Sequence, residues 1–268
     1  MIKVRPPAVA GAFYPGDRDR LAATLDRLLA DAPPSPRKVP QALVVPHAGY
    51  IYSGPIAASA YARLRGAASQ LRRVVLLGPS HRVRLRGLAL PDTDGLATPL
   101  GVLPVDSEGA AAVARLPQVS SSALAHAQEH SLEVQFPFLQ RVLPGVPVVP
   151  LVVGAASAEQ VAEVLEQLWA QEGTLVLISS DLSHYLTYEE AREVDRETAD
   201  RILALGAEQV DTDQACGAIP LSGLLLAALR RGLRAEELDL RNSGDTAGDR
   251  SRVVGYGAFA FDLPQETV

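Results

Sequence analysis

Short, wholly apolar runs alternate along this chain with longer segments in which apolar residues recur every three or four positions. The runs at 42–45, 74–77, 146–153 and 174–179 are rich in β-branched residues, which is typical of strands buried on both faces of a parallel sheet. Helical stripes are predicted after residue 17 and over 56–65, 107–116, 157–169 and 221–230, and a closing strand over 253–261. The alternation predicts one three-layer α/β domain, residues 1–268, with a central mixed, largely parallel sheet flanked by helices.

Polar residues mark where several of these helices begin. Asp17 stands before a stripe of leucines and is expected to cap that helix. Ser157 with Gln160, and Thr187 with Glu190, have the spacing of capping boxes. A linker rich in proline is predicted over 32–40, and 92–99 is predicted as a polar turn region.

Two of the apolar runs lead directly into histidines. His47 follows the first run after a single proline, and His81 follows the second after a Gly-Pro-Ser break. Ser53 and Pro55 are expected to start the next helix, as cap and first-turn proline. Open α/β sheets bind their ligands at the carboxyl ends of the strands, so both imidazoles are expected at one edge, where they would begin a metal site.

Further titratable residues follow a predicted strand or begin a predicted helix, so their side chains could lie at the same edge of the sheet as the two imidazoles. Asp181 and His184 follow the run at 174–179, and His130 stands beside two glutamates at a predicted helix start. An Asp-x-x-His pair can ligate metal or act as an acid/base pair near neutral pH. Asp181 as a helix cap, with His184 as a surface ring, is an equally weighted interpretation.

The single cysteine, Cys216, precedes a predicted buried helix. A helix amino terminus lowers the pKa of a thiol and favours the thiolate, the form that binds metal. Two histidines and a thiolate suit iron, copper or zinc. A Cys216–His dyad acting on acyl or amide substrates is the alternative, although it leaves the other histidines without a role.

Composition narrows the possible partners. With 268 residues, 47% of them hydrophobic, the chain can form a large core, and its net charge of −6 argues against a nucleic-acid-binding surface. The arginines at 72–73 and 82–86 are therefore expected at strand edges or in solvated loops. We expect no internal disulfide, no membrane span and no secretory leader, and a cytoplasmic location.

Several short motifs occur in order, and together they carry a family resemblance. They are Gly11-Ala12-Phe13-Tyr14-Pro15, Pro46-His47-Ala48-Gly49-Tyr50, Leu77-Gly78-Pro79-Ser80-His81, Glu129-His130-Ser131-Leu132-Glu133, Ser179-Ser180-Asp181-Leu182-Ser183-His184, Ala215-Cys216-Gly217, Gly244-Asp245 and Val254-Gly255-Tyr256. With these motifs the chain resembles the MEMO1 family over almost its whole length, in particular the prokaryotic branch called AmmeMemoRadiSam system protein B.

The resemblance implies a fold related to the class III extradiol dioxygenases, which use non-haem Fe(II). It implies that His47, His81 and Cys216 are the metal ligands. It places His130, Asp181 and His184 in the same cleft, and from the same motifs we expect Tyr50, Ser80 and Glu133 to contact substrate. The dioxygenases complete their site with a carboxylate, whereas this chain offers Cys216. The family name implies association with a radical SAM protein and an AMMECR1-type protein.

Three functional hypotheses follow. The first is a mononuclear redox enzyme that binds iron or copper and moves protons through His184, Asp181 or His130. The second is a metal-binding adaptor without turnover. The third, ranked lower, is a zinc hydrolase with Glu133 or His130 as general base. In each case a small molecule or a peptide is the expected ligand of the cleft.

Overall fold

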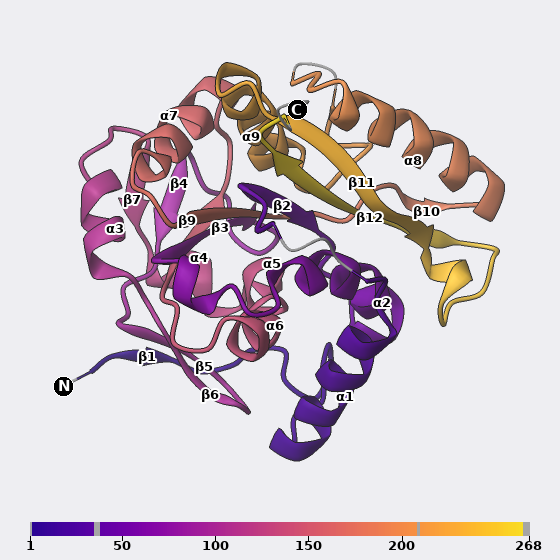
Figure 1. The fold of residues 1–268 in the computed structure, drawn as a ribbon, viewed down its shortest axis with the longest axis horizontal. Coiled ribbons are helices and arrows are strands. Elements are labelled where there is room, and N and C mark those ends of the chain that lie inside the picture. Colours follow the sequence, from indigo (N-terminus) through magenta and orange to yellow (C-terminus); the bar gives the residue numbers. More distant parts are fainter. Residues whose placement is uncertain (1, 35–37, 208–209, 265–268) are drawn as a thin grey trace.

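The computed structural model describes residues 2–34, 38–207 and 210–264, and its centre is a twisted mixed sheet (Figure 1). In the described parts of the chain, the strands of this sheet follow in the spatial order β10 (His184–Leu186), β12 (Val253–Asp262), β2 (Ala42–Val45), β9 (Thr174–Ser179), β3 (Arg73–Pro79), β8 (Val148–Val153), β4 (Leu88–Leu90) and β7 (Val119–Ser121), with β11 (Arg234–Asn242) also paired to β12. A small separate sheet contains β1 (Val4–Arg5), β5 (Gly95–Thr98) and β6 (Gly101–Pro104).

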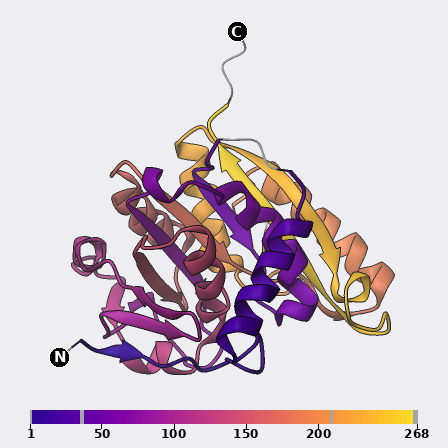
Figure 2. The ribbon, with the colours of Figure 1, turned by 60° about the horizontal axis from the view of Figure 1, so that its bottom comes forward.

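Helices cover both faces of the central sheet, which confirms the three-layer architecture. Figures 1 and 2 show α1 and α2 on one face and α7 and α9 on the other. The first layer holds α1 (Arg18–Asp31), α2 (Tyr50–Tyr61), α4 (Ala123–Ala127), α5 (His130–Glu133) and α6 (Phe136–Val142); the second holds α3 (Ser107–Val113), α7 (Ala158–Trp169), α8 (Tyr188–Leu203) and α9 (Ala218–Arg230). Short 3₁₀ turns complete the chain at Ala62–Leu64, Ala68–Gln70 and Ser243–Asp245.

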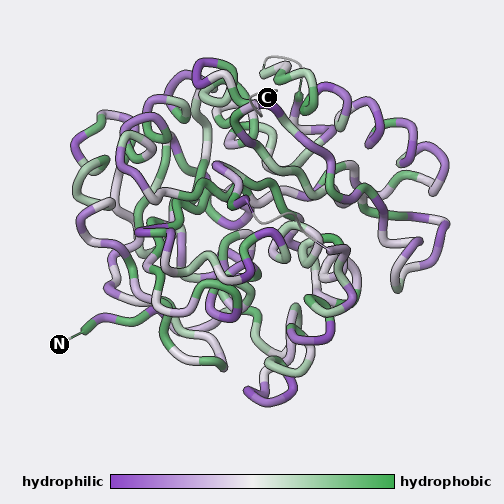
Figure 3. Tube along the Cα trace, in the orientation of Figure 1, coloured by the Kyte–Doolittle hydropathy of each residue, from purple (hydrophilic) through white to green (hydrophobic). Residues whose placement is uncertain are grey.

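Each central strand divides its apolar side chains between these two layers. In β2, Leu43 and Val45 pack into one core, and Ala42 and Val44 into the other. This follows from the two-residue period of a strand. Figure 3 shows the result as a hydrophobic centre with mixed polarity on the outer helices. Among the described residues, no helix combines the length and apolar character that crossing a membrane requires.

The four strands β2, β9, β3 and β8 are parallel, so their carboxyl ends meet at one edge. Val45 is paired with Ser179, and Pro79 with Val153. The loops that leave β2, β3 and β9 therefore emerge side by side. The expectation that His47, His81 and Asp181 share one edge is confirmed.

Most of the predicted helix starts are confirmed, and one is wrong. Asp17 accepts a hydrogen bond from the Arg20 N–H, and both predicted capping boxes are present. The helix predicted to start at Ser53 instead begins at Tyr50, with Gly49 as its N-cap and Pro55 inside it. The Tyr50 N–H donates to Phe13 O of the amino-terminal arm, so a distant segment supplies the partner that a local cap would otherwise provide.

One further expectation is revised. The region 92–99, expected as a polar turn, contains the strand β5. The strand β11 has no counterpart in the sequence-based prediction, because its charged residues obscure any apolar pattern. The predicted linker at 32–40 lies in part outside the described residues.

Candidate metal centre

His47 is held in one orientation and one tautomer by the end of β9. Its Nδ1 lies 3.0 Å from Ser179 Oγ. That hydroxyl donates its own hydrogen to Ser131 O at 2.6 Å, and it accepts a hydrogen bond from Gln135 Nε2. Because the Ser179 hydroxyl donates its only hydrogen to Ser131 O, it can only accept a hydrogen bond from His47. Nδ1 of His47 therefore carries the proton. His47 Nε2 therefore keeps the lone pair that a metal needs.

His81 is fixed in the same way by a carboxylate. Its backbone N–H donates to Glu129 Oε2 at 2.6 Å, and its Nδ1 lies 2.9 Å from Glu129 Oε1. Burial would raise the pKa of Glu129, but the hydrogen bonds from His81 and from Ser131 N hold it at about 2. The ionised carboxylate can only accept, so Nδ1 of His81 is the donor and Nε2 remains for a ligand.

Cys216 completes the group from the far side of the cleft. Its Sγ lies 3.3 Å from His47 Nε2, and its backbone N–H donates to Asp181 O. The ligand atoms of His47, His81 and Cys216 all lie within 4.8 Å of one another. Gly217 lets this segment approach β9, because a Cβ there would stand 2.6 Å from the Cβ of Ser180.

The thiol of Cys216 does not have the lowered pKa that the sequence predicts. Burial and the nearby charge of Asp181 raise its pKa to about 12. Cys216 precedes Gly217, the N-cap of α9, so its sulfur lies outside the first turn, where the helix dipole would offset that rise. A cation bound beside the sulfur would reverse this balance and favour the thiolate.

His130, the first residue of α5, lies against both candidate metal-binding imidazoles. Its ring centroid lies 4.6 Å from that of His81 and 5.5 Å from that of His47. Burial and these neighbouring imidazoles lower its pKa to about 4, and burial lowers that of His47 to about 3. Both rings are therefore neutral at pH 7, the state in which imidazole ligates metal or accepts a proton. His130 Nδ1 is buried and makes no hydrogen bond.

Asp181 and His184 lie close to the candidate metal ligands but differ in exposure. Asp181 is buried, accepts from the His47 N–H at 2.7 Å, and has its pKa raised by that burial. His184 is exposed at the start of β10, where the pairing with β12 is irregular. The next residue, Tyr185, has a φ of 60°. Such local irregularity re-aims side chains and is common beside functional sites.

Two of the expected substrate contacts have other roles. Glu133 is fully buried in an ion pair with Arg5, and it also accepts from the backbone N–H groups of Ala8 and Val9. Tyr50 is buried, and its hydroxyl donates to Val134 O. Glu133 thus holds the amino-terminal arm, and Tyr50 contacts the segment between α5 and α6. The polar side-chain groups of both residues are engaged within the protein, so neither offers a free group to substrate.

Ser80 does line the cleft, although its hydroxyl donates to Val83 O. It belongs to a groove of about 720 Å³ next to the candidate metal ligands. The wall and floor of this groove include His81, Cys216, Ile219 and the segment 82–86.

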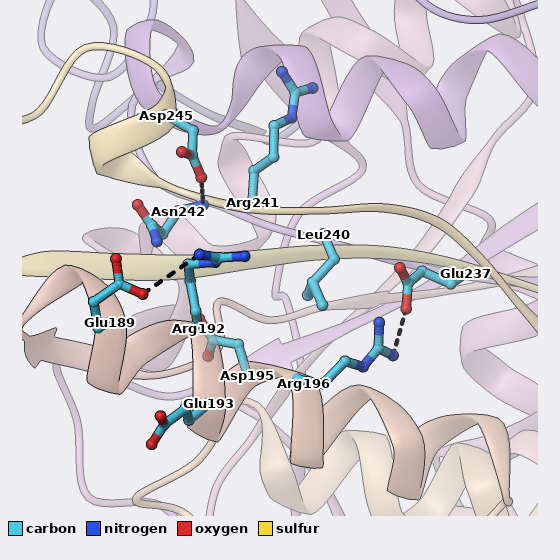
Figure 4. A pocket seen from close by; sticks show the side chains of 10 residues that line it. All are labelled: Glu189, Arg192, Glu193, Asp195, Arg196, Glu237, Leu240, Arg241, Asn242 and Asp245. Atoms are coloured by element: carbon cyan, nitrogen blue, oxygen red, sulfur yellow. Dashed lines mark hydrogen bonds and ion pairs between the residues drawn. The ribbon is translucent and has the colours of Figure 1, made fainter.

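A second cavity, of about 500 Å³, lies between α8 and β11, and no histidine is among the described residues that line it (Figure 4). Figure 4 shows that charged side chains line it. Arg196 is paired with Glu237 at 2.6 Å and Arg192 with Glu189 at 3.4 Å. Asp195 at its base accepts from the Ser183 N–H, and burial raises the pKa of Asp195 to about 6. Asp195 of α8 is therefore hydrogen-bonded to the loop that carries Asp181 and His184.

The sequence did not identify the residues that orient the two histidines. In the sequence Glu129 stands out only as a neighbour of His130, and neither Ser179 nor Gln135 is predicted to orient a histidine. A usable signal was present for Glu129, since a carboxylate at a helix start beside a histidine-bearing edge is a frequent partner for a metal-binding imidazole. No local pattern marks Ser179 or Gln135, because each acts across a long sequence separation.

Comparison with known proteins identifies the family. A family model described as "Memo-like protein" matches residues 5–260. The chain is 37% identical to a MEMO1 family protein of Aquifex aeolicus, with 97% of this chain and 100% of that protein covered. A MEMO1 family protein of Archaeoglobus fulgidus is 36% identical, with coverage of 96% and 99%. The chain belongs to the MEMO1 family.

A further MEMO1 family protein, from Methanosarcina acetivorans, is 38% identical over 97% of this chain and its own full length. Among solved structures, the crystal structure of uncharacterized protein JW3007 from Escherichia coli K12 matches with a TM-score of 0.51 at 15% identity, and covers 82% of this chain and 99% of that one. At that identity the likeness concerns the fold alone. Within the MEMO1 family fold of this chain, His47, His81 and Cys216 form a group that could hold a metal.

Proposed function

We propose that this MEMO1 family protein binds one transition metal ion, iron or copper in preference to zinc, through His47, His81 and Cys216, and acts as a metal-dependent redox protein. The observation that carries the proposal is the matched restraint of both imidazoles. Each Nδ1 is engaged, by Ser179 Oγ or by Glu129 Oε1, and each Nε2 is left for a ligand beside the Cys216 sulfur. Such outer partners are typical of metal-binding histidines.

The donor set fits this assignment chemically. Two neutral imidazoles and a thiolate favour the softer transition metals over magnesium or calcium. A bound iron or copper ion would supply one-electron redox chemistry at the mouth of the cleft, as in the non-haem iron dioxygenases that the family resembles. The surrounding residues supply the proton chemistry: Asp181, whose pKa is raised by burial, can hold a proton, and the neutral ring of His130 can accept one.

Two alternatives make different predictions. A zinc hydrolase needs a general base. The carboxylate of Glu133 forms an ion pair with Arg5, so of the two expected bases His130 is the remaining candidate. An adaptor that binds metal without turnover would keep the same ligands, and Cys216 in place of the dioxygenase carboxylate favours it. From the resemblance we also propose a radical SAM protein and an AMMECR1-type protein as partners, which co-purification from coexpressing cells would test.

The deciding experiment is the metal content of protein purified without oxygen from cells grown in plain medium. We expect iron or copper near one ion per chain, lost in Cys216→Ser and retained in His126→Gln. His126 is a suitable control because it is a buried histidine outside the cleft whose Nε2 is hydrogen-bonded to Ala89 O. Zinc at the same level would favour the hydrolase, and protein without metal would contradict the proposal.

A further inference from the structure

The groove beside the candidate metal ligands carries an unbalanced positive charge. Arg82, Arg84 and Arg86 all line it. All three are exposed, whereas the intervening Val83 and Leu85 are partly buried. Val83 and Leu85 line the groove as well, so the whole segment 82–86 forms one of its walls and brings three arginines to it.

This arginine segment is held rigidly. Leu85 O accepts from the Ala155 N–H, and the Gly87 N–H donates to Ala155 O, so the segment is tied to the end of β8. Gly154 permits this contact, because a Cβ there would lie 2.1 Å from Leu85 O. At the other end, the Ser80 N–H donates to Val153 O. A binding surface with so little backbone freedom loses little entropy when a ligand binds.

The three arginines also lack acidic partners. Within the described residues none of them makes an ion pair, whereas other arginines of the chain are paired, such as Arg230 with Glu159 and Arg141 with Asp26. No aspartate or glutamate lines the groove in the described part of the chain. In a protein whose net charge is −6, this unpaired cluster is a local feature that attracts anions.

The rest of the groove indicates what the anion is attached to. Its floor includes Pro79, Val153 and Ile219, which are apolar, and His81 and Cys216 stand at one end. Guanidinium groups match carboxylate and phosphate oxygens in a two-pronged geometry. Together, an anion-binding wall, an apolar floor and a metal-ligand end fit a compact organic acid.

We propose that this groove binds a small organic anion, a carboxylate or a phosphate on a compact apolar body, with its acidic group on Arg82, Arg84 and Arg86 and its other end facing His81 and Cys216. The proposal rests on the proposed function for the identity of the site, because it names the substrate class of the metal centre. Anion binding itself depends on the arginines and can be measured with or without metal.

The test uses calorimetric titration with isophthalate, the neutral analogue isophthalamide, and inorganic phosphate, on metal-loaded and metal-free protein. We expect isophthalate to bind more tightly than isophthalamide, and binding to weaken as NaCl is raised. Tighter binding of phosphate than of isophthalate would assign the site to phosphate esters. The variant Arg82→Gln/Arg84→Gln/Arg86→Gln should lose about tenfold in affinity, the combined loss of three exposed ion pairs.

The matched control is Arg18→Gln/Arg27→Gln/Arg115→Gln, which removes the same charge from exposed positions on other elements. It should bind isophthalate like the wild type. Equal binding of isophthalate and isophthalamide, unchanged affinity in the groove variant, or binding of a single-stranded thymidine oligonucleotide in place of both small anions would overturn the proposal. Absence of metal with intact anion binding would instead contradict only the proposed redox function.

Discussion

Cys216 Sγ lies 3.3 Å from Nε2 of His47, although 169 positions separate the two residues in the chain. The contact joins the loop after β2 to the segment that precedes α9. It exists because β2 and β9 are adjacent parallel strands and Cys216 N–H is bonded to Asp181 O just beyond β9. The sheet edge and the start of α9 therefore create the ligand set together.

The first prediction concerns the identity of the metal. Cys216→Asp replaces a soft sulfur donor with a hard carboxylate, so preference should shift from iron and copper toward harder ions such as manganese. Cys216→Ala should lower affinity at least 10- to 100-fold, the range seen even for outer partners. Its free energy of unfolding should change by only about 1 kcal/mol. Anaerobic metal competition with the three proteins is the measurement; equal selectivity in all of them would remove Cys216 from the site.

A second prediction concerns the carboxylate behind His81. Glu129→Gln keeps an acceptor for His81 Nδ1 but removes the charge that makes the imidazole more basic. Metal affinity should fall roughly 10- to 100-fold. Glu172→Gln, an exposed substitution of the same kind, should leave affinity unchanged. If both variants bind metal like the wild type, the hydrogen bond between Glu129 and His81 has no role in ligation.

A third prediction separates stability from function at Glu133. Glu133→Gln leaves Arg5 buried beside a neutral amide, and breaking a buried pair in this way costs about 3–5 kcal/mol. The midpoint of urea unfolding should fall accordingly, while metal affinity per folded molecule stays at the wild-type value. Lost activity without lost stability would return Glu133 to the general-base role that the sequence suggested.

Glu133 also shows where sequence reasoning fails. Its partner Arg5 is 128 positions away, so no local pattern reveals that the carboxylate is already neutralised.

The edge position of His47, His81 and Asp181 was predictable, because it depends only on buried strands followed by polar residues. The approach of Cys216 was expected from the resemblance and not from spacing, since it depends on how α9 docks against β9. The sequence does not predict the groove, because the arginines at 82–86 are expected at strand edges or in solvated loops.

The fourth prediction concerns His126 in the metal-free protein. Burial lowers its pKa from 6.5 to about 4, so between those values the unfolded state binds more protons than the folded state. Stability should therefore rise with pH from 4 to 6.5, and acidification should remove up to about 3 kcal/mol through this group. Relative to the wild type, His126→Gln should show a shallower pH dependence of urea unfolding across that window. An identical pH dependence would mean that His126 is not the group that titrates.

The last prediction concerns His184, which is exposed and lowers the pKa values of the nearby His47 and Asp181 through its charge. It is absent from the His47–His81–Cys216 group of potential ligands. His184→Ala should therefore leave metal content unchanged and alter turnover or its pH profile, because a proton-transfer residue would be lost. His184→Gln is the informative companion, since it keeps hydrogen bonding without titrating. If either variant loses its metal, His184 is a ligand, and the assignment of Cys216 as the third donor would be wrong.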